Sequence, residues 1–307
     1  MSEAVDLRGL TKDFGDLRAV DGLDLRVHRG EMFALVGPDG AGKTTCMRLI
    51  CGAMLPTDGE AFVEGVGVTE DPERVKRMVG YMSQRFSLYG ELSVAENLRF
   101  FSDLRGVKSK ERLQRAGELL SMTRLQEFTA RRAEQLSGGM KQKLALACTL
   151  IHVPRVLLLD EPTTGVDPVS RREFWRILHN LKKNDVTILV STPYMDEAER
   201  CDRVGFVHHG KLIDVGTPDE LLDGLAGGVL RVYTPRAFAA QKVLGGIAGV
   251  ESVQMFGDRL HLLCGDPGTV RTAAVSALEN AGHGDFKIET AAPTLEDVFV
   301  SLTSHQG

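Results

Sequence analysis

A glycine-rich stretch ending in a lysine and two threonines carries the strongest chemical signal in the chain. It follows an apolar run at 32–36 and precedes a helical pattern at 46–50, which is the strand–turn–helix context of a phosphate-binding loop. Glycines let successive backbone N–H groups face a phosphate chain, and the new helix adds the positive end of its dipole. Lys43 can reach the β- and γ-phosphates, and the Thr44 hydroxyl can ligate Mg²⁺. The predicted nucleotide-binding residues are Gly37, Pro38, Asp39, Gly40, Ala41, Gly42, Lys43, Thr44 and Thr45.

Two carboxylates end a second apolar run, Val156 to Leu159. A continuous apolar run suits a parallel strand covered on both faces, and ligands of open α/β sheets bind at the carboxyl ends of such strands. Asp160 is therefore predicted to help hold Mg²⁺, and Glu161 to polarise a water for attack on the γ-phosphate.

A third motif, Leu-Ser-Gly-Gly-Met-Lys-Gln, spans residues 136–142. Ser137 is a good helix N-cap, and the glycines after it leave the first amides of the helix uncovered. The motif predicts a second anion site that has no lysine. A routine helix cap would be the better interpretation if the chain had no phosphate loop.

Apolar periodicity indicates an α/β chain that places these motifs at strand ends and helix starts. Alternating strands precede the phosphate loop, and helical patterns fill residues 85–152. We predict a P-loop (RecA-like) core with an antiparallel β subdomain and a helical subdomain over residues 1–223. A linker at 224–228 and a small α+β accessory or regulatory domain of split βαβ type at 229–307 would complete the chain.

Composition limits the function classes. The chain has 307 residues, 43% hydrophobic and 26% charged, which suits a globular protein of more than one domain. A net charge of -5 argues against a nucleic-acid binder. No apolar run approaches the roughly 20 residues that span a bilayer, and the N-terminus does not read as a signal peptide. The five scattered cysteines predict reduced core thiols in a cytosolic protein.

Taken together, the phosphate loop, the 136–142 motif and Leu-Leu-Leu-Asp-Glu-Pro resemble the ATP-binding cassette family over about residues 4–223, most closely the ATPase subunit of a bacterial multidrug or antibiotic exporter. The resemblance implies that Phe14 stacks on adenine, with Val20 against the base or ribose. Gln84 matches a glutamine that reaches Mg²⁺ and the attacking water and links the site to the membrane subunit. Four positions match groups at the dimer interface: Ser137, Gly138, Gly139 and Asp167. The first three belong to the motif that ends at Gln142, which in the family closes on the γ-phosphate of the opposite subunit.

This resemblance implies an ATPase with ATP and Mg²⁺ as cofactors, working as a homo- or heterodimer at the cytoplasmic face of the membrane. It would drive export of a drug-like, lipid or other substrate by a separate permease, and would touch the membrane only through that permease. A cassette ATPase acting on DNA or ribosomes is the competing class. It fits less well, because the chain is acidic, has one cassette, and lacks sustained heptads between the phosphate loop and the third motif.

Two positions depart from the family pattern. Asp39 stands where the family has asparagine, and its carboxylate near phosphates is mildly unfavourable. Pro193 stands where the family has its switch histidine, and proline has neither a side-chain donor nor a titratable ring. We therefore expect nucleotide binding with slowed hydrolysis. The alternative is a weakly hydrolysing, nucleotide-gated regulatory subunit paired with another ATPase chain.

Overall fold

The computed structural model describes residues 2–84, 88–257 and 259–304. The chain forms two compact units, Met1–Val215 and Gly216–Gly307. This boundary precedes the one expected from the sequence after residue 223, because helix α8 (Pro218–Asp223) packs against α11 (Leu295–Ser304) of the second unit. The expected linker at 224–228 also runs into a strand, since β11 begins at Gly228.

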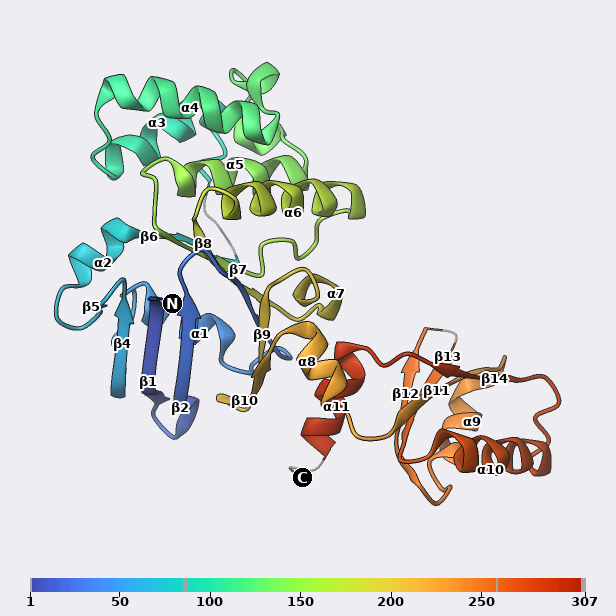
Figure 1. The fold of residues 1–307 in the computed structure, drawn as a ribbon. Coiled ribbons are helices and arrows are strands. Elements are labelled where there is room, and N and C mark those ends of the chain that lie inside the picture. Colours follow the sequence, from blue (N-terminus) through green and yellow to red (C-terminus); the bar gives the residue numbers. More distant parts are fainter. Residues whose placement is uncertain (1, 85–87, 258, 305–307) are drawn as a thin grey trace. The chain divides into compact units, whose positions relative to one another are not determined.

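The first unit is built on a six-stranded sheet with the order β10-β9-β3-β8-β7-β6 (Figure 1). The pairs joining β9, β3, β8, β7 and β6 are all parallel. β3 and β7 are buried along their whole length, as their continuous apolar runs predict. The strands are β3 (Met32–Val36), β6 (Val79–Met82), β7 (Val156–Asp160), β8 (Thr187–Thr192), β9 (Arg203–His208) and β10 (Lys211–Gly216).

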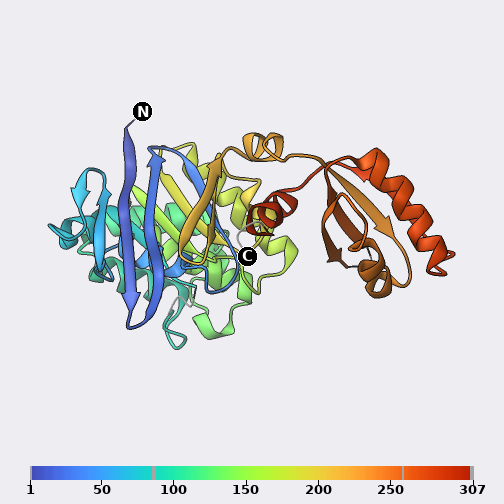
Figure 2. The same cartoon turned by 90° about the horizontal axis from the view of Figure 1, so that it is seen from below.

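A second, antiparallel sheet has the order β2-β1-β4-β5. Figure 2 shows its two long strands, in dark blue, side by side. Helix α1 (Lys43–Ile50) packs into a core that includes side chains of both sheets. The strands are β1 (Glu3–Phe14), β2 (Leu17–His28), β4 (Asp58–Val63) and β5 (Val66–Gly67). This sheet is the antiparallel β subdomain expected from the sequence.

The helical subdomain lies within the expected range, of which residues 85–87 fall outside the described part of the chain. Helix α3 opens with the capping box that the sequence predicts: Ser93 Oγ accepts the Glu96 N–H, and the Glu96 carboxylate accepts the Ser93 N–H. The helices of the first unit are α1, α2 (Pro72–Met78), α3 (Val94–Leu104), α4 (Ser109–Thr123), α5 (Gly138–Leu150), α6 (Pro168–Lys182) and α7 (Met195–Ala198). Short 3-10 turns occupy Gln126–Phe128 and Ala133–Gln135.

The second unit contains the βαββαβ series that the sequence predicts, with strand order β12-β13-β11-β14. Its described pairs are antiparallel, which is the split βαβ arrangement. Helices α9 and α10 pack on one face of this sheet over a separate apolar core. The elements are β11 (Gly228–Tyr233), α9 (Ala237–Leu244), β12 (Val250–Phe256), β13 (Arg259–Cys264), α10 (Pro267–Asn280) and β14 (Lys287–Ala291), followed by α11. All five cysteines of the chain are free and buried.

His152 ties the end of α5 to the start of β6. Its Nε2 lies 3.1 Å from the Val79 carbonyl oxygen, which can only accept, so this nitrogen carries the proton. Burial, together with the nearby charge of Arg105, lowers the pKa of His152 to about 4. The folded chain therefore holds this ring neutral, while the unfolded chain protonates it near pH 6.5.

We predict that His152 makes the fold less stable as the pH falls from about 6.5 to about 4, because the unfolded state then binds a proton that the native state does not. The His152→Gln variant keeps an N–H donor for Val79 and does not titrate. Urea unfolding of both proteins at pH 7 and pH 5 should show the larger loss in the wild type. Parallel pH profiles would contradict the prediction.

Candidate functional site

The phosphate loop connects β3 to α1, as its sequence predicts. Gly42 has φ +104°, and a Cβ there would lie 2.3 Å from the Ala19 carbonyl oxygen, so only glycine fits the start of α1. Lys43 is the first residue of α1, which places the loop before it at the positive end of the helix. The loop is therefore shaped by its own residues and by the neighbouring strand β2.

Lys43 is folded into the loop and almost completely buried. Its Nζ donates to the carbonyl oxygens of Gly37 at 2.8 Å and Pro38 at 2.9 Å, and lies 3.5 Å from Glu161 Oε1. These contacts satisfy the buried ammonium group without a ligand. The ammonium group of Lys43, which the sequence predicts to bind phosphates, is thus held within the loop by carbonyl oxygens that phosphate oxygens can replace.

A cavity of about 480 Å³ lies against this loop. Phe14, which the sequence predicts to stack on adenine, lines it and is 46% exposed. Val20 does not line it: this side chain is buried in the core, because strand alternation turns it to the inner face of β2. Leu17 and Ala19 line the cavity instead. The other lining residues are Asp39, Gly40, Ala41, Gly42, Lys43, Thr44, Thr45, Gln84 and Glu161.

Asp160 ends β7 beside the loop and is fully buried. Its Oδ1 accepts hydrogen bonds from Thr44 Oγ1 at 3.0 Å and Ser191 Oγ at 2.6 Å, and its Oδ2 accepts from Tyr81 Oη at 3.2 Å. Burial, together with the Asp160 carboxylate, raises the pKa of Tyr81, so the phenol remains a donor. Thr44 and Asp160, which the sequence predicts separately as Mg²⁺ ligands, are thus in direct contact, whereas the sequence predicted no role for Ser191 or Tyr81.

Glu161 follows in a left-handed conformation with φ +48°, which is uncommon for a residue other than glycine. Gln84 Nε2 donates to its Oε2 at 2.9 Å, and Thr164 Oγ1 donates to the same oxygen at 3.4 Å. Two residues that the sequence singled out independently, 77 positions apart, are therefore in direct contact. Glu161 also lines the cavity at the phosphate loop, so the structure brings the predicted acid, glutamine and loop together.

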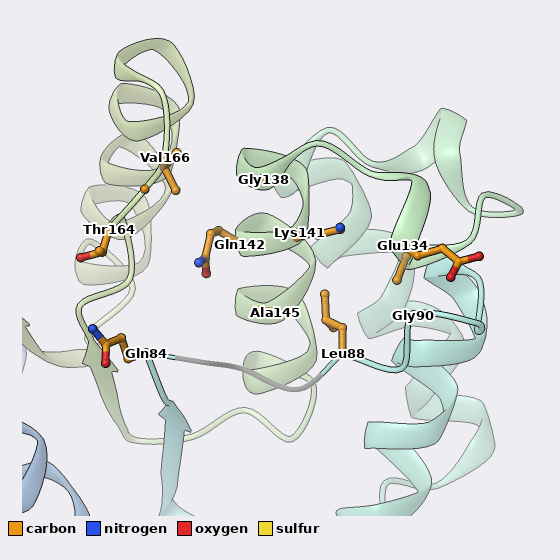
Figure 3. A pocket seen from close by; sticks show the side chains of 12 residues that line it. Gln84, Leu88, Gly90, Glu134, Gly138, Lys141, Gln142, Ala145, Thr164 and Val166 are labelled. Atoms are coloured by element: carbon orange, nitrogen blue, oxygen red, sulfur yellow. The ribbon is translucent and has the colours of Figure 1, made fainter.

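The residues of the 136–142 motif lie elsewhere. Ser137 caps α5 by accepting the Met140 N–H, as predicted, and Gly138 and Gln142 line a second cavity of about 390 Å³. Figure 3 shows Gln142 reaching toward the loop that carries Thr164 and Val166. Gln84 lines both cavities, whereas none of the motif residues lines the one at the phosphate loop.

Asp167 sits beside this motif as the N-cap of α6. Its carboxylate accepts the backbone N–H groups of Val169 at 3.0 Å and Ser170 at 2.9 Å, and the hydrogen bonds from Ser170 lower its pKa. The exposed Asp167 remains an anion at neutral pH and fixes the start of α6 against Gly139.

Pro193 follows β8 directly and is half-buried. The preceding Thr192 donates to the buried Glu197 at 2.8 Å and accepts the Tyr194 N–H at 3.0 Å. This segment therefore stands at the same sheet edge as Asp160, but its proline offers no polar group there.

Comparison with known proteins assigns the family. The ABC transporter family model matches residues 20–164. The Nod factor export ATP-binding protein I of Rhizobium etli is 36% identical over 305 residues, covering 99% of this chain and 94% of that protein. The chain belongs to the ABC transporter family. The daunorubicin resistance ATP-binding protein DrrA3 of Streptomyces coeruleorubidus is also 36% identical, covering 98% of this chain and 96% of that protein.

Another relative is longer. The probable multidrug ABC transporter ATP-binding protein YbhF of Escherichia coli K12 is 46% identical over 217 residues, which cover 71% of this chain but 38% of YbhF. The match therefore covers well under half of the length of YbhF.

Solved structures show the same fold. One described as the ATP-binding subunit of an ABC transporter matches with a TM-score of 0.66 and 30% identity over 72% of this chain and 92% of that one. The ATP-binding cassette MJ0796, described as a dimer in a post-hydrolysis state bound to ADP and Pi, matches with a TM-score of 0.64 and 26% identity over 69% of this chain and 98% of that one. The first unit is thus a P-loop cassette, as expected. Among the described residues, no helix is both long and apolar enough to cross a bilayer.

The two glycines of the 136–142 motif have different reasons to be glycine. A Cβ on Gly139 would lie 2.3 Å from Ser170 Oγ and 2.4 Å from Ser170 Cβ, whereas a Cβ on Gly138 would meet no atom within 4 Å. Packing of α5 on α6 thus requires glycine at position 139, whereas this chain's own packing does not require glycine at position 138.

We predict that Gly139→Ala lowers the free energy of unfolding by about 1–3 kcal/mol through this overlap, and that Gly138→Ala changes it by less than about 0.5 kcal/mol. Denaturant titration of both variants measures the difference. Adding Ser170→Gly to Gly139→Ala should recover most of the loss because it removes both clashing atoms. Equal stability of the two single variants would contradict this reasoning.

Proposed function

We propose that this chain is the ATP-binding and ATP-hydrolysing subunit of an exporter. The observation that carries the proposal is the convergence of the phosphate loop, Glu161 and Gln84 at one cavity, with an exposed aromatic ring among its lining residues. The buried Asp160 supports this cavity from behind through its hydrogen bond with Thr44. The adenine of ATP stacks on Phe14, and the triphosphate lies along the loop from Gly37 to Thr45. Lys43 exchanges its carbonyl partners for the β- and γ-phosphates.

Mg²⁺ fits this site because the available donors are oxygens. Thr44 Oγ1 and Asp160 Oδ1 lie 3.0 Å apart, and Thr44 and Gln84 both line the cavity at the phosphate loop. No group of three or more His, Cys, Asp or Glu residues gathers in the described ranges, so phosphate oxygens and water must complete the coordination of any ion. Bound Mg²⁺ would neutralise charge that develops on the phosphates.

Glu161 acts as the general base, and Gln84 orients it. Gln84 donates to the carboxylate and so fixes the oxygen that accepts a proton from the attacking water. Because the contact between Glu161 and Lys43 joins opposite charges, the base becomes available once the lysine has turned to a phosphate.

We further propose that two cassettes form each complete site. Ser137, Gly138, Gly139 and Gln142 do not line the cavity at the phosphate loop of their own chain, so they serve the γ-phosphate of a second ATPase chain, with Asp167 at the interface. A two-fold arrangement satisfies both chains at once. The open space at Gly138 supports this assignment, because it leaves the helix N-terminus accessible.

The remaining partners follow from the relatives, whose names include multidrug, Nod factor and daunorubicin resistance proteins. We propose a separate membrane permease as the partner and a drug-like, lipid or other exported substrate. The chain would lie on the cytoplasmic face of the membrane, would touch the bilayer only through the permease, and would bind no nucleic acid. The second unit would be an accessory or regulatory domain.

A second function is favoured by Pro193 alone. Without a histidine donor at this position, hydrolysis slows, and the chain would act as a nucleotide-gated regulatory subunit beside another ATPase chain that turns over ATP. Turnover by the purified chain, with and without a permease, distinguishes the two functions.

The Glu161→Gln variant tests the principal function. We expect hydrolysis to fall at least about 100-fold, because the base is lost, while ATP affinity stays within about threefold. ATP should also shift this variant from monomer to dimer in light scattering. Glu118→Gln, which changes an exposed charge on α4, is the control. Unchanged turnover in Glu161→Gln would refute the role of Glu161.

The Pro193→His variant tests the departure from the family. We expect its turnover rate to rise about tenfold, since an imidazole adds a donor at this sheet edge, and the gain to depend on pH near 6.5. Pro193→Ala removes the ring without adding a donor and should match the wild type. An equal rate in all three proteins would mean that another group already fills the histidine's role.

A further inference from the structure

Ser191 lies within β8, one residue before its end, and is fully buried. The parallel register places it opposite Asp160 of β7. Its side chain is therefore directed at the last residue of the neighbouring strand by sheet pairing alone. The sequence predicted no role for this side chain.

The hydrogen bonds of this hydroxyl have one consistent assignment. The Glu161 backbone N–H can only donate, and it points to Ser191 Oγ at 3.1 Å. The single Ser191 proton is therefore free to go to Asp160 Oδ1 at 2.6 Å. One hydroxyl thus holds the side chain of Asp160 and the backbone of Glu161 in a fixed relation. This backbone is the one in the strained left-handed conformation.

Tyr81 holds the same carboxylate from the opposite side. It lies on β6, which flanks β7 on the side away from β8, and donates to Asp160 Oδ2 at 3.2 Å. Ser191 and Tyr81 thus bond to different oxygens from different strands. Rotation of the carboxylate about its Cβ–Cγ bond would break at least one of these contacts.

We propose that Ser191 and Tyr81 are positioning residues that orient the Asp160 carboxylate toward the divalent cation of the nucleotide complex. This inference rests on the proposed function. Thr44 also contacts Asp160, but it is itself a candidate ligand, whereas Ser191 and Tyr81 act only through the carboxylate. Hydrogen bonds that orient a metal ligand typically change metal affinity about 10- to 100-fold when removed.

Binding of Mn²⁺ to the full-length chain in the presence of ATP tests this assignment, with free Mn²⁺ measured by electron paramagnetic resonance. We expect Ser191→Ala to weaken Mn²⁺ binding about tenfold and Tyr81→Phe to weaken it by a smaller factor. ATP affinity measured in EDTA should stay within about twofold of the wild type, because neither residue lines the cavity at the phosphate loop. A merely structural role would move both affinities together.

Thr187→Val is the matched control. It removes a buried hydroxyl at the other end of β8, where Thr187 Oγ1 accepts the Gly30 N–H at 3.0 Å. Its Mn²⁺ affinity should equal that of the wild type. If Ser191→Ala does not fold, Ser191→Cys keeps a side chain of similar shape with a weaker donor, and Tyr81→Phe tests the other oxygen independently.

Unchanged Mn²⁺ affinity in the folded variants, beside normal wild-type binding, would overturn this inference alone. An equal loss in Thr187→Val would also overturn it, because the effect would then be one of general stability. A wild-type chain that binds ATP no better with Mn²⁺ than in EDTA would overturn the proposed function as well.

Discussion

The parallel register of β3, β8, β7 and β6 is the constraint on which the rest of the site depends. Val36 lies opposite Thr192, Asp160 opposite Ser191, and Met82 opposite Leu159. Each strand therefore stops at the same edge, and its next residues project into the same region. A slip of one residue would turn every side chain to the other face of the sheet and would separate the carboxylates from the loop.

This edge holds one half of the proposed site, and the helical subdomain holds the other half elsewhere. The start of α5 packs against α6 so closely that Gly139 admits no side chain, which fixes the 136–142 motif beside Asp167 rather than beside the phosphate loop. The separation of the two halves is thus built into helix packing. Gln84, which lines both cavities, is the physical link between them.

Local signals made much of this predictable from the sequence. The phosphate loop before α1, the acidic end of β7 and the capping box at Ser93 depend on residues close in the chain, and each forms as expected. Ser191 and Tyr81 carried no such signal, because their contacts arise from the pairing of strands that are distant in sequence.

The two predictions that differ from the structure, the role of Val20 and the boundary between the units, failed because tertiary packing decided them. Val20 looked available to a ligand, but alternation along β2 turns it into the core and leaves its neighbours at the cavity. The boundary between the units likewise lies before α8, and not after residue 223 as predicted, because α8 packs on α11. This contact joins the two ends of the second unit's sequence. The hydrophobic pattern alone does not show against which other element a short helix packs.

The contacts of Lys43 join the phosphate loop to Glu161. Its ammonium group contacts both the loop's own carbonyls and Glu161. The loop is consequently held in shape by its own residues, and this preorganisation lowers the cost of ordering it around a ligand. While the lysine stays there, the carboxylate that would accept a proton is engaged by a cation. Under the proposed function, a phosphate would compete with Glu161 for the same lysine, so nucleotide binding and release of the base would be one coupled step.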